Sequence, residues 1–452
     1  MKKRILASLL SIIMILSLLP TVSFAVEVDP TSATSLAATG DTFTVENITY
    51  EVTGDNTVSV TKKGDGTLYS GGITIPSTVS YENTTYNVTA IGKDAFRSCK
   101  DLGAVIVPSS VKTIGQTAFG YIGSPMDMGT NIFSITLNEG LETIGAEAFI
   151  GSRKLKSIHI PASVTTLGDK IFQNSTNLTT VTFAEGSKLT AIPASCFYCN
   201  APGSLSSITL PEEITSIGRG AFCGTKLTSI HIPDGVTEIP ENAFYNTPLE
   251  TVTGLDGVTK IGNSAFKNTC LTGEFIIPNT VTEIGSSAFN STDFTKVVFE
   301  EGSRLATLGS SAFLGCSNLT EIAFPDTLTE LPAKVLEGCS KLTSVTLPSG
   351  ISAIPANAFK NCSSLGAIQI PASVTEMDAT AFSGCANLEN IDVGESMSFV
   401  TEDGLLYNRD KTKLLRAFHY ERITYEIPDS VTTIAEGALV GTTITSITFP
   451  ED

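Results

Sequence analysis

Residues 319–341 read LTEIAFPDTLTELPAKVLEGCSK, residues 342–364 read LTSVTLPSGISAIPANAFKNCSS, and residues 365–387 read LGAIQIPASVTEMDATAFSGCAN. All three are variants of one working pattern, LTxIxIPxxVTxIGxxAFxxCxx, in which x varies and the fixed positions admit similar residues. The apolar residue before the proline recurs every 22 to 27 residues along most of the chain. Such a period predicts a solenoid in which each copy forms one coil and neighbouring coils stack. The equivalent apolar positions are Ile160, Phe183, Leu210, Ile232, Leu255, Ile277, Phe299, Phe324, Leu347, Ile370 and Val393.

Each repeat divides into three segments. In LTxIxIP, apolar and polar residues alternate, which predicts a strand with one buried face, and the proline ends it because proline cannot donate to a ladder. VTxI predicts a second short strand on the opposite side of the coil. The glycine that follows suits a corner with positive φ; examples are Gly145, Gly168, Gly218, Gly262, Gly285 and Gly309. AFxxC predicts one helical turn whose Ala and Phe point inward.

The predicted fold is therefore a solenoid with a parallel β-sheet on the concave face, and with short second strands and single helical turns on the other side. One coil cannot bury its own apolar residues, so a continuous core requires stacking. We expect a phenylalanine series to form that core, with Leu336 and Leu439 at the same position in two coils. The series is Phe96, Phe119, Phe149, Phe172, Phe197, Phe222, Phe244, Phe266, Phe289, Phe313, Phe359 and Phe382.

The phrases IGxxAFxxC, LTSIxIP and VTxI resemble the BspA-like class of bacterial leucine-rich repeats. The resemblance extends from about residue 73 to residue 452 and comprises about fifteen coils. It implies a leucine-rich-repeat solenoid, export from the cell, binding to host matrix proteins or to other cells, and no enzymatic activity.

The N-terminal 25 residues have the layout of a secretory signal peptide. A basic start, MKKR, precedes the apolar run 5–19 and a site of small residues that ends at Ala25. The apolar run is shorter than the roughly 20 residues that a membrane-spanning helix needs. We expect cleavage after Ala25, no membrane span in the mature chain, and an extracellular protein that is secreted or associated with a cell surface.

The mature chain is predicted to have two parts: a linker with an N-terminal β-hairpin cap, residues 26–72, and the solenoid, residues 73–452. Alternating β-formers in residues 42–63 predict a strand meander that covers the first coil. No cap is visible after the last strand phrase, ITSITFPED.

Residues 394–428 interrupt the period and predict a β-hairpin insertion, in which Leu405–Tyr407 pairs toward Lys413–Ala417. Structural decoration is our preferred interpretation and a binding patch is the alternative, because the insertion carries five basic residues. These are Arg409, Lys411, Lys413, Arg416 and Arg422.

Catalytic and metal chemistry find little support in the sequence. The three histidines are His159, His231 and His419, and the first two occupy the same outward strand position three coils apart, too far to share one metal. No HExxH, GxSxG, phosphate-loop or EF-hand motif is present. We therefore predict no catalytic residue, no cofactor and no metal site.

Nine cysteines invite a disulfide interpretation, but their spacing favours free thiols. Four of them, Cys316, Cys339, Cys362 and Cys385, lie 23 residues apart, one in each coil. We expect a small buried hydrophobe at that position, with disulfides as the alternative.

The predicted function is a non-catalytic protein-binding or adhesion module. Its expected partner is a host or bacterial surface protein or glycoprotein, and the chain is expected to be a monomer. A net charge of −18 repels a phosphate backbone and excludes nucleic acid. The alternatives are a structural spacer that presents a further C-terminal domain, and the non-catalytic part of a larger enzyme.

The candidate ligand site lies where the two outward-pointing residues of the strand phrase LTxIxIP differ from those of most coils. Most coils carry Ser, Thr or His at these two positions, whereas three consecutive coils carry a charged residue and then an apolar one. Stacked strands would align them as a charged row beside an apolar row, which is typical of a protein-binding surface. An ion-pair ladder is the structural alternative. The residues are Glu274 and Ile276, Lys296 and Val298, and Glu321 and Ala323.

We predict that the chain hydrolyses no substrate in a broad panel of glycosidase, peptidase and esterase assays, because the sequence holds no convergent nucleophile, base or metal-ligand set. Reproducible turnover that is lost on replacement of a single carboxylate or serine would contradict this.

Overall fold

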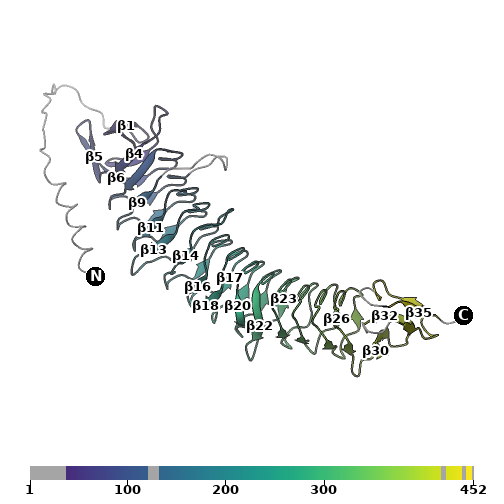
Figure 1. The fold of residues 1–452 in the computed structure, drawn as a ribbon. Coiled ribbons are helices and arrows are strands. Elements are labelled where there is room, and N and C mark those ends of the chain that lie inside the picture. The colour runs from purple at the N-terminus through teal and green to yellow at the C-terminus, as the bar shows by residue number, and fades with distance from the viewer. Residues whose placement is uncertain (1–36, 121–131, 419–423, 440–443, 450–452) are drawn as a thin grey trace, which may run out of the picture. The chain divides into compact units, whose positions relative to one another are not determined.

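A computed structural model of the chain describes residues 37–120, 132–418, 424–439 and 444–449. The predicted signal peptide 1–25, the linker up to residue 36, and His419 and Arg422 lie outside the described residues. From Ala38 onward the chain forms one compact unit, a β-solenoid of about 15 turns (Figure 1). The predicted solenoid is confirmed.

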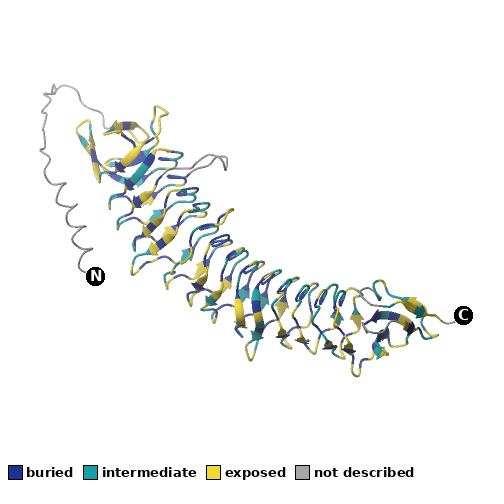
Figure 2. Ribbon diagram, in the orientation of Figure 1, coloured by how far each residue is buried: buried dark blue, intermediate teal, exposed yellow. Residues whose placement is uncertain are grey.

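One face of this unit, called here the long-strand face, is built from the LTxIxIP phrases. Its strands pair in parallel one coil apart, as Ile158 with Val181 and Val297 with Ile322. Buried and exposed residues alternate along them, as the sequence predicts (Figure 2). The strands are β4 (Gly71–Thr74), β7 (Leu102–Ile106), β9 (Ser134–Thr136), β11 (Ser157–Ile160), β13 (Thr180–Phe183), β16 (Ser229–His231), β18 (Thr251–Thr253), β20 (Thr272–Ile277), β22 (Asp293–Phe299), β24 (Glu321–Ala323), β25 (Ser344–Thr346), β27 (Ala367–Gln369), β29 (Asn390–Asp392), β33 (Thr424–Glu426) and β35 (Ser446–Thr448).

The second face, called here the short-strand face, is built from the VTxI phrases. Each strand has two residues and pairs in parallel with its neighbours, as Thr143 with Thr113 and with Thr166. The strands are β8 (Thr113–Ile114), β10 (Thr143–Ile144), β12 (Thr166–Leu167), β14 (Ala191–Ile192), β15 (Ser216–Ile217), β17 (Glu238–Ile239), β19 (Lys260–Ile261), β21 (Glu283–Ile284), β23 (Thr307–Leu308), β26 (Ala353–Ile354), β28 (Glu376–Met377) and β34 (Thr433–Ile434).

Prolines interrupt the short-strand face. In most coils the residue after the VTxI strand donates its N–H to the coil before, as Gly145 N does to Ile114 O at 2.7 Å. Pro193, Pro240, Pro332 and Pro355 occupy this position in four coils and have no N–H to give. The sheet is broken before β14, before β17 and on both sides of the coil that contains Pro332. Sequence alone therefore marks these breaks.

The glycines at this corner serve a purpose other than the one predicted. None of the six has a positive φ. A Cβ on Gly168 would lie 2.2 Å from Ala146 N, and one on Gly309 would lie 2.3 Å from Ser286 N. Glycine is therefore favoured because the backbones of neighbouring coils approach too closely for a side chain.

The predicted single helical turn is wrong, since the described residues contain no helix. In the segment around Phe289, Ser287 (φ 55°) and Ser291 (φ 58°) are left-handed, and an α-helix requires consecutive negative φ values. The segment is instead a pair of tight turns, in which Ala288 N donates to Gly285 O (3.3 Å) and Asn290 N to Ser287 O (3.1 Å). The signal missed is the frequent Asn or Gly at the second of these positions, since both residues adopt positive φ more readily than most.

These turns form a hydrogen-bonded ladder, here named the turn ladder, which is unbroken in the described residues from Phe96 to Ala381. The N–H of each core Phe from Phe96 to Phe359 donates to the carbonyl oxygen of the residue before the next core side chain, as Phe244 N does to Ala265 O (2.8 Å). The series begins with Phe96 N to Ala118 O (2.7 Å) and continues to Phe359 N to Ala381 O (2.8 Å).

The phenylalanine rings of the turn ladder stack on one another. Neighbouring rings from Phe96 to Phe313 lie 5.0 to 5.6 Å apart between centroids and within 19° of parallel. Leu336 then interrupts the series before Phe359 and Phe382 stack at 5.2 Å. All twelve Phe and Leu336 are at most 3% exposed, so the predicted core is confirmed for them. Leu439, predicted at the same position, is only half-buried.

An antiparallel meander precedes the first coils. It consists of β1 (Thr42–Val45), β2 (Ile48–Gly54) and β3 (Thr57–Thr61), and β3 pairs in parallel with β6 (Thr84–Ile91). β5 (Thr78–Tyr81) pairs with the other edge of β6, which in turn pairs with β8. The meander thus extends the short-strand face. Beneath it, the ring of Tyr69 packs 4.8 Å from Phe96 and covers that end of the ring stack.

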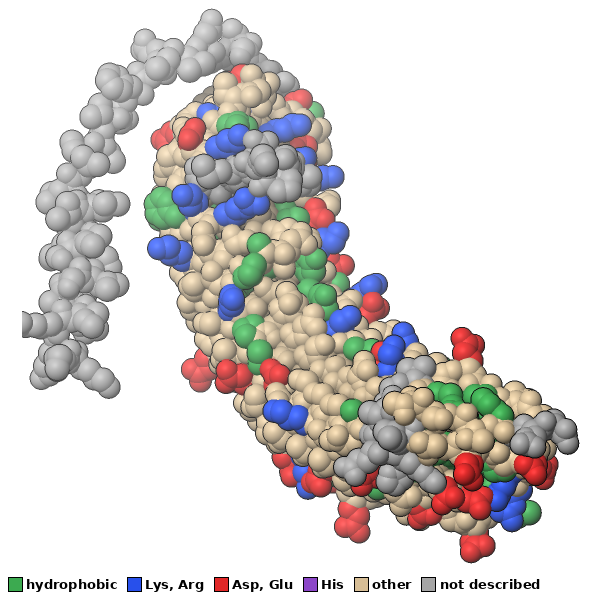
Figure 3. Space-filling model, turned by 45° about the vertical axis from the view of Figure 1, so that its right-hand side comes forward, with side chains coloured by type: hydrophobic (Ala, Val, Ile, Leu, Met, Phe, Trp, Pro, Cys, Tyr) green, Lys and Arg blue, Asp and Glu red, His purple; other side chains and the backbone are tan. Residues whose placement is uncertain are grey.

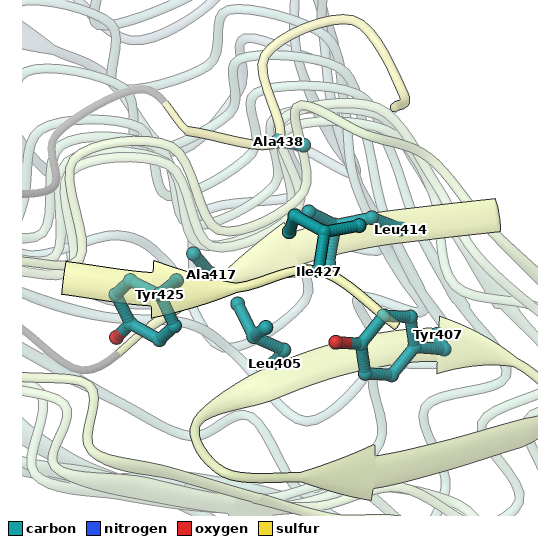
Figure 4. Close-up of a cluster of buried hydrophobic side chains, with 7 residues drawn as sticks. All are labelled: Leu405, Tyr407, Leu414, Ala417, Tyr425, Ile427 and Ala438. Atoms are coloured by element: carbon teal, nitrogen blue, oxygen red, sulfur yellow. The ribbon is translucent and has the colours of Figure 1, made fainter. Parts of the chain in front are cut away.

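The insertion at 394–428 contains a second meander of the same design. β30 (Phe399–Glu402), β31 (Leu405–Asn408) and β32 (Lys413–Ala417) are antiparallel, and β32 pairs in parallel with β34. The predicted pairing of β31 with β32 is present, whereas β30 was not predicted. A hydrophobic cluster joins it to the coils beside it (Figure 4), formed by Leu405, Tyr407, Leu414, Ala417, Tyr425, Ile427 and Ala438.

Three of the five basic residues of this insertion make structural contacts. Arg416 is 3% exposed and its Nη2 donates to the carbonyl oxygen of Phe382 at 2.6 Å. Lys411 pairs with Glu402 in the same meander, and Arg409 donates to Ser396 O. These contacts favour decoration over a free basic patch.

We predict that Phe289→Ala lowers the free energy of unfolding by about 3–5 kcal/mol, because it leaves a cavity in the ring stack. Phe133→Ala is the matched control, since that ring is 61% exposed, and it should change stability little. Chemical denaturation followed by circular dichroism measures both. Equal effects of the two substitutions would contradict the assigned core.

Candidate functional site

The six residues of the predicted ligand site lie together on the long-strand face. They belong to β20, β22 and β24, which are adjacent in the four-stranded sheet β20-β22-β24-β25. Glu274 is in register with Lys296, and Lys296 with Glu321. Ile276 is in register with Val298, and Ala323 follows in β24. We call these six residues the strip.

The charged row of the strip is a continuous ion-pair ladder. Lys296 Nζ lies 2.8 Å from Glu321 Oε1 and 3.7 Å from Glu274 Oε2. The pKa of Lys296 is raised, first by its hydrogen bond to Glu321 and further by the charge of Glu274. These side chains are about half exposed, so solvent screening leaves each pair only a small contribution to stability.

The apolar row faces solvent beside the ladder. Ile276 is 53% exposed, Ala323 is exposed and Val298 is half-buried. Strand alternation explains this orientation, because the flanking Phe275 and Val297 point into the core. Ion pairing accounts for the charged row but gives no reason for apolar residues on the solvent side.

Aromatic packing holds the strip in place from below. Phe275 is 8% exposed and its ring meets that of Phe289 at 5.2 Å and 62°. Phe294 is fully buried and meets the ring of Phe313 at 6.2 Å and 70°. β20 and β22 are the longest strands of this face, with 6 and 7 residues. The strip is therefore a firm surface that can contribute apolar contact and paired charges to a partner.

The wider surface has mixed charge. On the face drawn in Figure 3, Lys and Arg side chains lie among Asp and Glu side chains, and hydrophobic side chains are exposed in small separate groups. Within the described ranges, no group of three or more His, Cys, Asp or Glu residues is arranged to hold a metal ion. In the same part of the chain we find no helix with the length and apolar character needed to cross a bilayer.

The two described histidines occupy equivalent outward positions. His159 Nδ1 lies 2.9 Å from Thr182 Oγ1, and His231 Nδ1 lies 3.0 Å from Thr253 Oγ1. Each contact joins a histidine to a threonine in the next coil. The rings thus bridge neighbouring strands at separate places on the sheet.

The cysteine position has a polar role that the sequence prediction missed. All nine cysteines are free thiols, and eight are buried. Cys362 Sγ donates to Leu336 O at 3.2 Å, and Cys385 Sγ to Phe359 O at 3.0 Å. Thr247 and Thr269 fill the same position and donate to Phe244 O and Phe266 O. The shared property is a small side chain with a donor for a buried carbonyl of the turn ladder, rather than a hydrophobe.

Comparison with known families decides the identity of the repeat. The model for the BspA type leucine rich repeat region matches in 6 copies, over residues 77–125, 120–203, 190–304 and 293–410. The chain belongs to this family. BspA-type repeats therefore account for the greater part of the solenoid, and the predicted resemblance is confirmed. No curated protein sequence matches the chain.

Solved structures of bacterial leucine-rich-repeat proteins resemble this one. A leucine-rich repeat protein from Bacteroides ovatus ATCC 8483 is 28% identical, with 78% of this chain and 89% of that chain covered and a TM-score of 0.58. A leucine rich cell surface protein from Faecalibacterium prausnitzii A2-165 is 26% identical, with 79% and 96% covered and a TM-score of 0.45. Membership of the BspA type is consistent with a non-catalytic surface or binding module.

We predict that a thiol reagent at about pH 8 labels Cys270 in the folded protein and all nine cysteines after denaturation. Burial also raises the pKa of Cys270, but this thiol is partly exposed and open to the reagent, whereas burial raises the pKa of Cys199, Cys223 and Cys385 to about 11. The thiolate is the reactive form, so a raised pKa suppresses labelling until unfolding restores the ordinary value. Mass spectrometry counts the labels, and coil-to-coil disulfides would contradict this.

Proposed function

We propose that this chain is a non-catalytic adhesion module, which binds a host or bacterial surface protein or glycoprotein through the strip. The observation that carries the proposal is an exposed apolar row, Ile276 with Val298 and Ala323, held beside a charged row on the longest strands of the long-strand face. Apolar surface bordered by charge is the usual composition of a protein-binding site.

The two rows would contribute differently. Burial of exposed apolar area gives about 25 cal/mol per Å², so Ile276 and Val298 would supply affinity. The charged row would orient the partner and reject those with the wrong charge pattern, since rim charges act more on specificity and association rate. Firm packing of Phe275 and Phe294 below the strip limits the ordering cost of binding.

Several further features support a surface role. The N-terminal residues have the pattern of an export signal, and family membership is consistent with a surface module. The net charge of −18 disfavours nucleic acid and other polyphosphates as partners. The mature chain would then work outside the cell.

We predict that the exported chain, screened against immobilised matrix proteins, mucins and bacterial glycoproteins, binds at least one of them through the strip. Ile276→Ser combined with Val298→Ser should weaken that binding about tenfold or more, with an almost unchanged melting temperature. Surface plasmon resonance and thermal denaturation measure the two quantities.

Ile106→Ser is the matched control. Ile106 is 43% exposed and occupies the same outward position of the strand phrase in β7, far along the repeat series from the strip. Its replacement should leave binding intact. Binding that survives the double substitution, or no binding to any member of the panel, would contradict the proposal and favour a structural spacer.

A further inference from the structure

One strand phrase of the long-strand face does not form a strand. Residues 205–211, LSSITLP, fit the repeat pattern, yet they make no ladder with either neighbouring coil. Residues 206–210 take part in no backbone hydrogen bond. Many neighbouring strands of this face are paired, as where Ile232 N donates to Thr253 O (2.9 Å) and Val107 N to Thr136 O (3.0 Å). The ladder is also interrupted between β9 and β11, between β18 and β20, between β25 and β27, and between β29 and β33, but in those places both phrases still form strands.

An insertion before this strand phrase explains why the phrase is displaced from the sheet. The period is 27 residues here because YCNAPGS, residues 198–204, adds length before the strand phrase. Gly203 N donates to Gly224 O (3.0 Å), and Leu205 O accepts from Lys226 N (2.9 Å). These bonds fix the start of the segment outside the usual register. Leu205 and Leu210 remain buried, so the core continues while the ladder does not.

The missing strand leaves a gap in the sheet between β13 and β16, and the facing edges of these two strands are unpaired. In β13, Thr180 N and Ala184 N donate to the coil that contains β11. Backbone groups of successive residues in a strand point to opposite sides. The N–H and C=O of Val181 and Phe183 therefore point away from β11 and toward the gap. In β16, the backbone N–H of Ile232 donates toward β18, so by the same alternation the backbone N–H and C=O of His231 point toward the gap. Unpaired edges inside a sheet are templates for an added strand.

A groove lies along these edges. Its volume is about 1130 Å³, and its lining includes β13, residues 207–213, β16 and part of β18. The outward side chains of Thr182, Ser207 and Thr209 line it and are exposed. Phe183 is the one phenylalanine, tyrosine or tryptophan of the lining and is half-buried, so the groove offers no open ring for sugar stacking.

Acidic side chains lie at one end of the groove. Glu185 follows β13, and Glu212 and Glu213 follow the displaced phrase, so three exposed carboxylates lie where these chain segments end. Lys188 is the single lysine or arginine of the lining. A basic side chain would complement this end.

We propose that the groove binds an extended peptide segment of a partner protein by strand addition, with a lysine or arginine of that segment beside Glu212 and Glu213. Backbone hydrogen bonds to the edges of β13 and β16 would give affinity, and the carboxylates would select the basic residue. This site is separate from the strip and goes beyond the proposed function, because it lies on other strands and recognises main chain.

The test is a selection from a display library of random peptides of about ten residues on the immobilised full chain. Ser207→Tyr fills the groove, and Ser344→Tyr places the same ring at the matching exposed position of β25, a strand that is paired with β24 and lies outside the groove. We expect selected peptides to bind wild type and Ser344→Tyr equally, and to lose about tenfold or more in affinity for Ser207→Tyr. If Ser207→Tyr does not fold, Thr209→Tyr with Thr346→Tyr as control replaces the pair.

Two further measurements separate strand addition from other binding. Methylation of alternate backbone nitrogens in a selected peptide should abolish binding, because it removes the donors while keeping every side chain. Glu212→Gln with Glu213→Gln should weaken binding of basic peptides, whereas the matched pair Glu300→Gln with Glu301→Gln should not. The strip variant Ile276→Ser with Val298→Ser should bind peptide normally. Selection of no peptide sensitive to Ser207→Tyr, or undiminished binding after methylation, overturns the proposal.

Discussion

The hydrogen bond from each core Phe N–H to the next coil is the interaction on which the stack depends. In the described part of the chain this ladder is unbroken from Phe96 to Ala381, whereas both β faces are broken in several places. Each bond contributes only about 0.5–1.5 kcal/mol, but a buried phenylalanine accompanies almost every one. Hydrogen bonding and ring stacking therefore act at the same position of every repeat.

A continuous turn ladder leaves the two faces free to vary. Pro193 and Pro240 remove bonds from the short-strand face, yet the coils on either side remain stacked. The insertion at 198–204 displaces a strand phrase of the other face while Phe197 stays in the ring stack. Features that could meet a partner, the strip and the groove, both lie on the long-strand face. Departures from the repeat pattern are therefore found on the two faces, where they leave the buried core intact.

Two meanders of the same design flank most of the solenoid. β1–β3 and β30–β32 each join the short-strand face through a parallel pair, with β6 and β34 respectively. A polar side chain lies at each end of the ring series: the ring of Tyr69, which follows the first meander, lies against Phe96, and Arg416 of the second meander donates to Phe382 O. The phenylalanine series is thus covered at both ends by elements outside the repeat.

The sequence by itself determined the coil, its two strands and its buried phenylalanines, because these follow from apolar residues at fixed spacing within one repeat. It also contained the positions of the strip, since outward residues alternate with inward ones. Tertiary structure decided what depends on contacts between coils. Gly168 is required by the backbone of Ala146, Cys362 donates to a carbonyl of the preceding coil, and left-handed residues replace the expected helical turn because alternate N–H groups donate across coils. The groove beside residues 206–210 also depends on contacts between coils. Periodicity is a property of one repeat, whereas the register of a strand is set by partners more than twenty residues away in the sequence.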